Sequence, residues 1–111
     1  MLDLPAEQAA LVLREVPRLC RAVAAATDCD GINVWQNSGP ASNQVVFHLH
    51  IHIIPRFHGD DVPAQIAARK QLSAEESEAL VAKIKAALAR DIEPASATAV
   101  VAPRPWMVTK L

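Results

Sequence analysis

The chain has 111 residues, enough for one small domain, which excludes a multidomain enzyme. Its 11 Lys and Arg against 12 Asp and Glu give a net charge of -1, so no overall basic field is available to hold a nucleic acid or an anionic membrane. No apolar run approaches the roughly 20 residues of a membrane span. The first residues also lack the basic and apolar regions of a signal peptide, so we expect a cytoplasmic location.

A first helix is predicted from Pro5 to Ala26, where apolar residues recur at three- and four-residue spacing. Pro17 falls inside it and predicts a kink or a short break near residues 15–16. The polar run Asp28-Cys29-Asp30-Gly31 then predicts a turn. The spacing of the two cysteines fits neither a zinc knuckle nor a redox pair, so both are expected to be reduced thiols.

Two strands are predicted next. Residues 32–36 alternate in polarity and favour a short strand, and residues 37–43 have the composition of a loop. Residues 44–54 alternate again and predict a second strand, which Pro55 is expected to end because proline has no amide donor. The two strands therefore predict an antiparallel hairpin with a long connection.

The second predicted strand carries His48, His50 and His52 at a spacing of two. In an extended strand these three side chains lie on one face, about 6.6 Å apart per step. Mutual repulsion and partial burial are expected to lower the pKa of each imidazole, and His50 has a neighbour on both sides. A neutral imidazole acts as a nucleophile, a general base or a metal ligand, and the pattern alone leaves all three open.

Residues 56–71 show no clear period and are predicted to be mostly loop. Ser73 and Glu76 then match a capping box, as N-cap and third helical residue, and predict a helix that ends at about Arg90. The apolar stripe of this helix consists of Leu80, Val81, Ile84 and Leu88. Two helices and a hairpin together predict an α+β fold.

Asn37-x-Gly39 followed by the run from Gln44 to Arg56 resembles the histidine-triad (HIT) family of nucleotide hydrolases and transferases, whose motif alternates histidine with apolar residues. The resemblance covers roughly residues 2–92, so we expect a partial HIT-like domain in 1–92 and a tail or arm in 93–111. HIT proteins generally have about three strands and a helix ahead of this region. The N-terminal part of the fold is therefore expected to be missing, as in a fragment or a shortened reading frame.

The resemblance implies a hydrolase that cleaves at the α-phosphate of a purine nucleotide conjugate, a phosphoramidate or a dinucleoside polyphosphate, without a cofactor. His50 would be the nucleophile and carry a nucleotidyl-histidine intermediate. His48 and His52 would orient and polarise around it, and His52 would also contact the phosphate or leaving oxygen. Asn37 and Gln44 would donate to phosphate oxygens. One departure is Ser42-Asn43, where the family usually has Ala-Gly before the glutamine.

Two alternatives remain beside the hydrolase. One is a catalytically impaired HIT-fold binding module that works as an oligomer. The other is a metal-binding protein that uses the three histidines, with His58 as a fourth ligand; it is disfavoured because ligands on one flat strand approach an ion from one side only.

Self-association is expected in every case, because apolar residues outnumber the partners that a short chain can offer them. The residues predicted to be buried are Leu11, Val16, Leu19, Val23, Ile32, Val34, Phe47, Leu49, Ile51, Ile53, Leu80, Ile84 and Leu88. The open edges of a two-stranded hairpin add to this requirement. We therefore expect a homodimer or a higher homo-oligomer that pairs through the helix from Pro5 to Ala26, as the resemblance implies.

Overall fold

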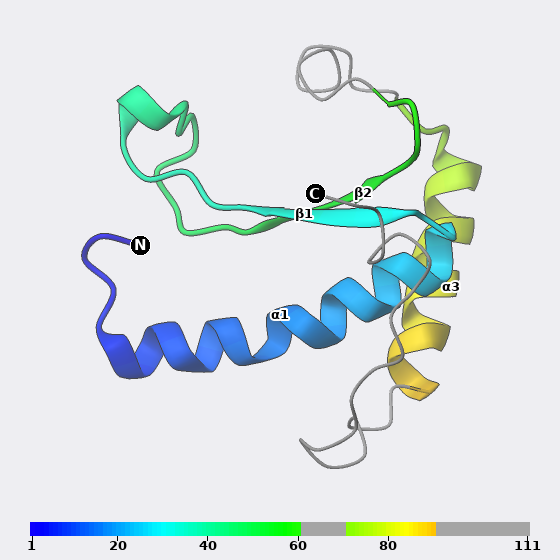
Figure 1. Ribbon diagram of the computed structural model, residues 1–111, viewed down its shortest axis with the longest axis horizontal. Helices are drawn as coiled ribbons and strands as arrows, with labels where there is room; N and C mark the ends of the chain where they lie inside the picture. The colour runs from blue at the N-terminus through cyan, green and yellow to red at the C-terminus, as the bar shows by residue number, and fades with distance from the viewer. Residues whose placement is uncertain (61–70, 91–111) are drawn as a thin grey trace, which may run out of the picture.

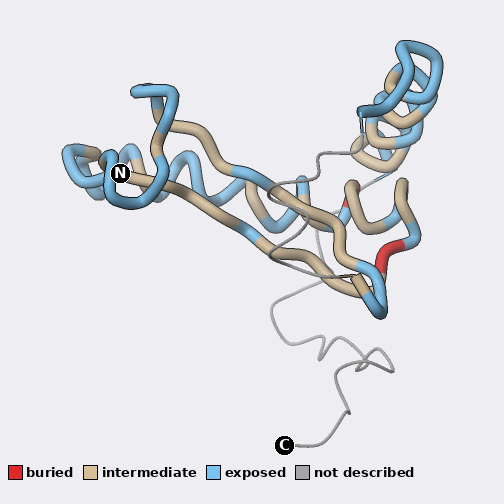
Figure 2. The backbone as a smooth tube through the Cα atoms, turned by 90° about the horizontal axis from the view of Figure 1, so that it is seen from above, coloured by how far each residue is buried: buried red, intermediate tan, exposed pale blue. Residues whose placement is uncertain are grey.

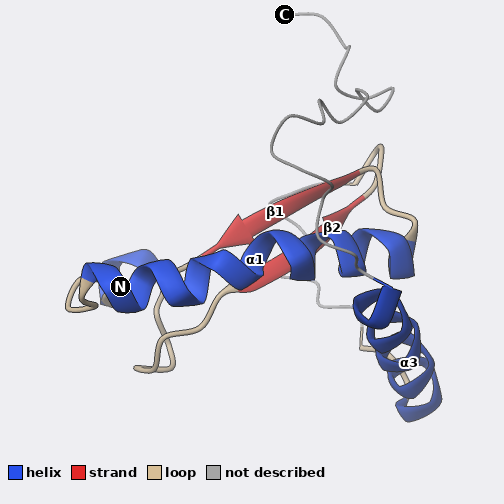
Figure 3. Ribbon diagram, turned by 90° about the horizontal axis from the view of Figure 1, so that it is seen from below, coloured by secondary structure: helices blue, strands red, loops and turns tan. Residues whose placement is uncertain are grey.

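The computed structural model describes residues 1–60 and 71–90 and confirms the predicted α+β class. Its elements are helix α1 (Ala6–Thr27), strand β1 (Gly31–Trp35), the 3-10 turn η1 (Pro40–Ser42), strand β2 (His52–Arg56) and helix α3 (Ala74–Arg90). Helix α1 runs along the two-stranded sheet and packs against both strands and against α3 (Figure 1, Figure 3). The predicted tail, residues 93–111, lies outside the described residues.

Helix α1 matches the predicted helix to within one residue at each end, and of the predicted kink or short break, the break is absent. The helix continues through Pro17 over all 22 residues. A proline removes a single backbone hydrogen bond, and the remaining bonds of a long, packed helix hold the flanking turns together. The helix ends at Asp28, which is left-handed at φ 52° and donates its N–H to the Ala24 carbonyl at 2.9 Å.

The antiparallel pairing of β1 with β2 confirms the predicted hairpin, in a register that runs from Gly31 opposite Arg56 to Trp35 opposite His52. Strand β2 does not end at Pro55, as predicted, but includes it and ends one residue later. Each strand of a two-stranded sheet has an open edge, and an edge strand accommodates a proline because not every amide is needed for the ladder.

The predicted strand over residues 44–54 is wrong in its first two thirds, because β2 begins only at His52. Residues 46–48 bend instead of continuing the strand. The alternating sequence lacks a partner here, since β1 ends at Trp35 and no other described segment pairs with residues 44–51. An extended segment needs a neighbouring ladder to satisfy its backbone groups, and without one the alternation does not produce a strand.

The described residues enclose almost no core. Only Ala22 and Cys29 are buried among the apolar side chains, and the buried segments in Figure 2 are correspondingly short. Four residues predicted to be buried are exposed, with exposed fractions of 58% for Leu11, 37% for Leu19, 46% for Val34 and 75% for Phe47. The apolar faces of α1 and of the histidine segment are therefore left uncovered by residues 1–60 and 71–90.

The capping box of α3 forms as predicted. The Glu76 amide donates to Ser73 Oγ at 3.1 Å, and the Ser73 amide donates to Glu76 Oε2 at 2.8 Å. Two amides that the helix itself cannot satisfy thus obtain acceptors.

Replacing Ser73 with alanine is expected to lower the free energy of unfolding by about 1 kcal/mol, because the Glu76 amide loses its acceptor. Urea denaturation followed by circular dichroism measures the change. Ser73→Asp is the matched control, since a carboxylate at the N-cap accepts the same bond. Equal stability of the alanine and aspartate variants would contradict the capping role.

Candidate functional site

A compact turn around η1 leads into the histidine segment. The Gly39 carbonyl accepts hydrogen bonds from the Ser42 amide at 3.2 Å, from Ser42 Oγ at 2.8 Å and from the Gln44 amide at 3.3 Å. Gly39 itself has φ 89°, a conformation that side chains disfavour. Asn43 is left-handed at φ 62°, and asparagine tolerates this region better than most residues. Asn43, where the resemblance leads us to expect glycine, thus has a backbone conformation that glycine adopts readily.

The two predicted phosphate-binding amides lie in and beside this turn. Gln44 Oε1 accepts from the Gly39 amide at 2.7 Å, and Gln44 Nε2 donates to the Val46 carbonyl at 3.2 Å. The side chain of Gln44 thus bonds to backbone groups on both sides of it in the loop. Asn37 is half-buried, and its backbone carbonyl accepts from Gln36 Nε2 at 2.8 Å. Among the hydrogen bonds of the described residues, neither predicted amide contacts a histidine.

His50 is half-buried, and its ring is held by the backbone. Its Nδ1 lies 2.7 Å from the carbonyl oxygen of His48. A carbonyl oxygen can only accept, so this bond places the ring proton on Nδ1. The neutral ring then has its lone pair on Nε2, the nitrogen that a nucleophile or a metal ligand would use.

His52 is exposed at the start of β2, directly opposite Trp35. Its ring meets that of His50 edge to face, with centroids 4.9 Å apart and an interplanar angle of 87°. The structure therefore brings His50 and His52 together, while the recorded contact from His48 to His50 comes through its backbone carbonyl. Sequence reasoning missed the role of that carbonyl, because every residue has one and the sequence gives no signal for its use.

His58 lies at the other end of the hairpin, just beyond β2. Its amide donates to Asp30 Oδ2 at 2.7 Å, and its Nε2 is 3.9 Å from Asp30 Oδ1. The structure therefore gives no support to His58 as a fourth ligand in the metal-binding alternative, because the ladder separates it from His52. No group of three His, Cys, Asp or Glu side chains within residues 1–60 and 71–90 is arranged to hold a metal ion.

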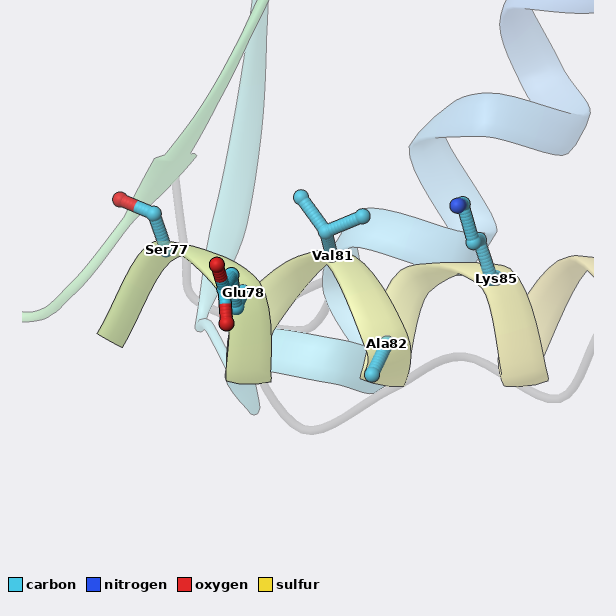
Figure 4. A pocket seen from close by; sticks show the side chains of 5 residues that line it. All are labelled: Ser77, Glu78, Val81, Ala82 and Lys85. Carbon is cyan, nitrogen blue, oxygen red and sulfur yellow. The ribbon is translucent and has the colours of Figure 1, made fainter. Parts of the chain in front are cut away.

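Other features of the described chain add nothing to this site. Both cysteines are free, as predicted, and burial raises the pKa of the Cys20 thiol while the nearby Arg21 charge opposes the shift. A shallow hollow runs along α3 and contains no histidine (Figure 4). Its lining residues are Ser77, Glu78, Val81, Ala82 and Lys85. In the part of the chain that the structure describes, neither helix has the length and apolarity to cross a bilayer.

These features are typical of proteins of the histidine-triad class. They are a helix packed on an antiparallel strand pair and an alternating histidine segment in which two imidazoles are in contact. The model of the HIT domain matches residues 1–59, so the chain belongs to the HIT domain family. This confirms the family expected from residues 37–56.

Similar proteins include an adenylylsulfatase of Arabidopsis thaliana, 38% identical over 68 residues, which cover 61% of this chain and 34% of that protein. A histidine triad nucleotide-binding protein from Sulfolobus tokodaii is 30% identical with a TM-score of 0.69, over 80% of this chain and 61% of the other. A zinc-bound histidine triad protein from Mycobacterium smegmatis is 31% identical with a TM-score of 0.63, over 80% and 60%. The chain thus spans from a third to three fifths of the length of these relatives.

Proposed function

We propose that this chain is a HIT-type nucleotide hydrolase that cleaves at the α-phosphate of a purine nucleotide conjugate, either a phosphoramidate or a dinucleoside polyphosphate. The observation that carries the proposal is the hydrogen bond from His50 Nδ1 to the His48 carbonyl. In the neutral imidazole this bond leaves the lone pair on Nε2, which is the form that a nucleophilic histidine needs.

In the first step, the Nε2 lone pair of His50 attacks the α-phosphorus. A P–N bond forms, the bond from phosphorus to the leaving group breaks, and the leaving group departs with a proton that His52 supplies. Water then attacks the same phosphorus and gives a proton to His52, the P–N bond breaks, and both histidines are regenerated as the nucleoside monophosphate leaves. The intermediate divides one difficult displacement into two easier ones, because a cationic imidazole is a good leaving group.

The phosphate oxygens would be bound by Asn37, Gln44 and His52. Asn37 and Gln44 are neutral donors that stabilise negative charge as it shifts during transfer. Gln44 Nε2 would have to exchange the Val46 carbonyl for a phosphate oxygen, while Gln44 Oε1 keeps its bond to the Gly39 amide. The bond to Gly39 would then hold the Gln44 side chain in place while its Nε2 binds the phosphate.

The relatives support this reading at the level of chemistry. One is described as an adenylylsulfatase and another as nucleotide-binding. The alternative of a catalytically impaired oligomeric binding module is favoured by one observation, the nearly absent core of the described residues. The partners proposed for either function are a purine nucleotide and a second copy of the chain, and the cytoplasmic location stays a prediction.

Thermal melts separate nucleotide binding from the metal-binding alternative, which the zinc-bound Mycobacterium smegmatis relative keeps open. A purine mononucleotide at 100 times its dissociation constant is expected to stabilise the protein by about 2.7 kcal/mol, whereas zinc has no effect. Dialysis against a chelator is expected to leave the melting temperature unchanged. A lowered melting temperature after dialysis, together with near-stoichiometric zinc by elemental analysis, would support the metal site and contradict the hydrolase.

A further inference from the structure

A polar network joins the two strands at the end of the hairpin that is remote from His50 and His52. Arg56, the last residue of β2, donates from Nε to Asp60 Oδ2 at 2.9 Å and from Nη2 to Asp60 Oδ1. Its Nη1 donates to Asn33 Oδ1, on β1, at 2.9 Å. The ion-paired side chains are only 12% and 16% exposed, so this is not a solvated surface pair.

Backbone groups extend the same network. The Asp30 amide, just before β1, donates to the Arg56 carbonyl at 2.8 Å. The Asp60 carboxylate also accepts from the Phe57 amide at 2.9 Å, and the Asp60 amide donates to the Phe57 carbonyl at 3.1 Å. Gly59 has φ 81° within this turn. The side chains of Asn33, Arg56 and Asp60 and the backbone amide of Asp30, hereafter the Arg56 network, thus bind the start of β1 to the end of β2.

Little else in the hairpin fixes which residues of the two strands face each other. A tight turn usually sets the register, but here the strands are joined by the long connection of residues 36–51. Burial of apolar side chains also does little to favour the observed register over a shifted one. One face carries Ile32 and Val34, the other carries Trp35 and Ile54, and none of the four is buried. A shift of two residues would keep every side chain on its face.

The Arg56 network, by contrast, is specific for the observed register. A two-residue shift in one direction would place His52 opposite Asn33 and move Asn33 away from the Arg56 guanidinium. A shift in the other direction would place His52 opposite Asn37 and separate the Asp30 amide from the Arg56 carbonyl, although Asn33 would then lie directly opposite Arg56. The first shift thus deprives Arg56 and Asn33 of each other, and the second deprives the Asp30 amide of its acceptor, and an enclosed polar group without a partner is costly.

We propose that the Arg56 network is the register lock of this hairpin, and that Arg56 is a positioning residue for the histidine site. It places His52, whose ring contacts that of His50, opposite Trp35. Buried polar groups are known to fix register in coiled coils, and we infer the same role for this network between two strands. The effect on turnover rests on the proposed function, whereas the effect on register does not.

The test compares Arg56→Gln with Ile84→Ala in the full chain. Ile84 lies half-buried on α3, so its truncation lowers stability without touching the hairpin. Nuclear Overhauser contacts between the backbone protons of Trp35 and His52 report the register. Arg56→Gln is expected to raise the ratio of shifted to native register by about tenfold, the change that follows from one lost charged hydrogen bond, and so to weaken this contact, while Ile84→Ala keeps it.

Kinetics give a second readout. If molecules in the wrong register are inactive, kcat is expected to fall in Arg56→Gln in proportion to the loss of the Trp35–His52 contact, with little change in KM. Arg56→Lys, which keeps the charge but not the forked geometry, is expected to restore part of kcat and part of the Trp35–His52 contact. If Arg56→Gln fails to fold, Asn33→Ala, which removes a single acceptor of the network, replaces it.

Retention of the Trp35–His52 contact in the variant that folds would overturn the register lock, whatever its activity. An equal loss of the contact in Ile84→Ala would overturn it too, since the effect would then follow from general destabilisation. If neither the parent chain nor any variant hydrolyses a nucleotide, the proposed function fails. The measurement of the Trp35–His52 contact still decides the register lock.

Discussion

Replacing His50 with alanine abolishes hydrolysis of an adenosine phosphoramidate or a dinucleoside polyphosphate, with an expected loss on the order of 10⁶-fold, while the chain stays folded. The reason is that Nε2 of His50 is the only atom of the protein that bonds to phosphorus in the proposed mechanism. A coupled assay for the released nucleoside monophosphate measures the rate, and circular dichroism checks the fold.

His48→Ala is the informative comparison, because alanine keeps the backbone carbonyl that holds Nδ1 of His50. Its loss of kcat is expected to be far smaller than that of His50→Ala. Intact-mass spectrometry of the quenched reaction should show a nucleotidyl adduct in the parent chain and none in His50→Ala. Wild-type turnover by His50→Ala would eliminate the nucleophile assignment, and equal losses in both variants would contradict the role of the carbonyl.

Light scattering at low micromolar concentration is expected to give at least twice the chain mass of 11.9 kDa. The described residues bury only two apolar side chains, and α1 exposes a group of large ones at 58% for Leu11, 40% for Val12, 45% for Leu13 and 37% for Leu19. Removing such a surface from water contributes roughly 25 cal/mol per Å². A second copy that pairs through α1 is the partner we propose for it.

Leu11→Asp tests the face directly, since a carboxylate inside the proposed interface is expected to reduce the mass toward that of one chain. Leu2→Asp is the matched control, because Leu2 is 83% exposed and lies outside α1. A well-folded parent monomer with a cooperative melt would show that the small core suffices. A monomer produced equally by both aspartate variants would place the interface elsewhere.

The helices could be predicted because their signals are local. The period of the apolar residues in α1 and the exchange of bonds between Ser73 and Glu76 in α3 act within a few residues of the chain. The family motif also identified the segment that carries the candidate site. The proximity of His50 and His52 follows from their spacing of two, and the structure has their rings in contact.

The extent of β2 could not be predicted in the same way. The alternation from Phe47 to Ile54 is a strand pattern, but a strand also needs a partner ladder, and β1 supplies one only from His52 onward. Pro55 likewise remains inside β2 because the sheet has two strands and an open edge.

The amino-acid sequence by itself determined the family, the two helices and the histidines of the candidate site. Only the tertiary structure decided that the His48 carbonyl sets the proton position on His50, and that Arg56 reaches Asn33 across 23 residues of sequence. The physical reason is that a motif records residue types and local spacing. A hydrogen bond to a carbonyl, or between two strands, depends on where the folded backbone places each group.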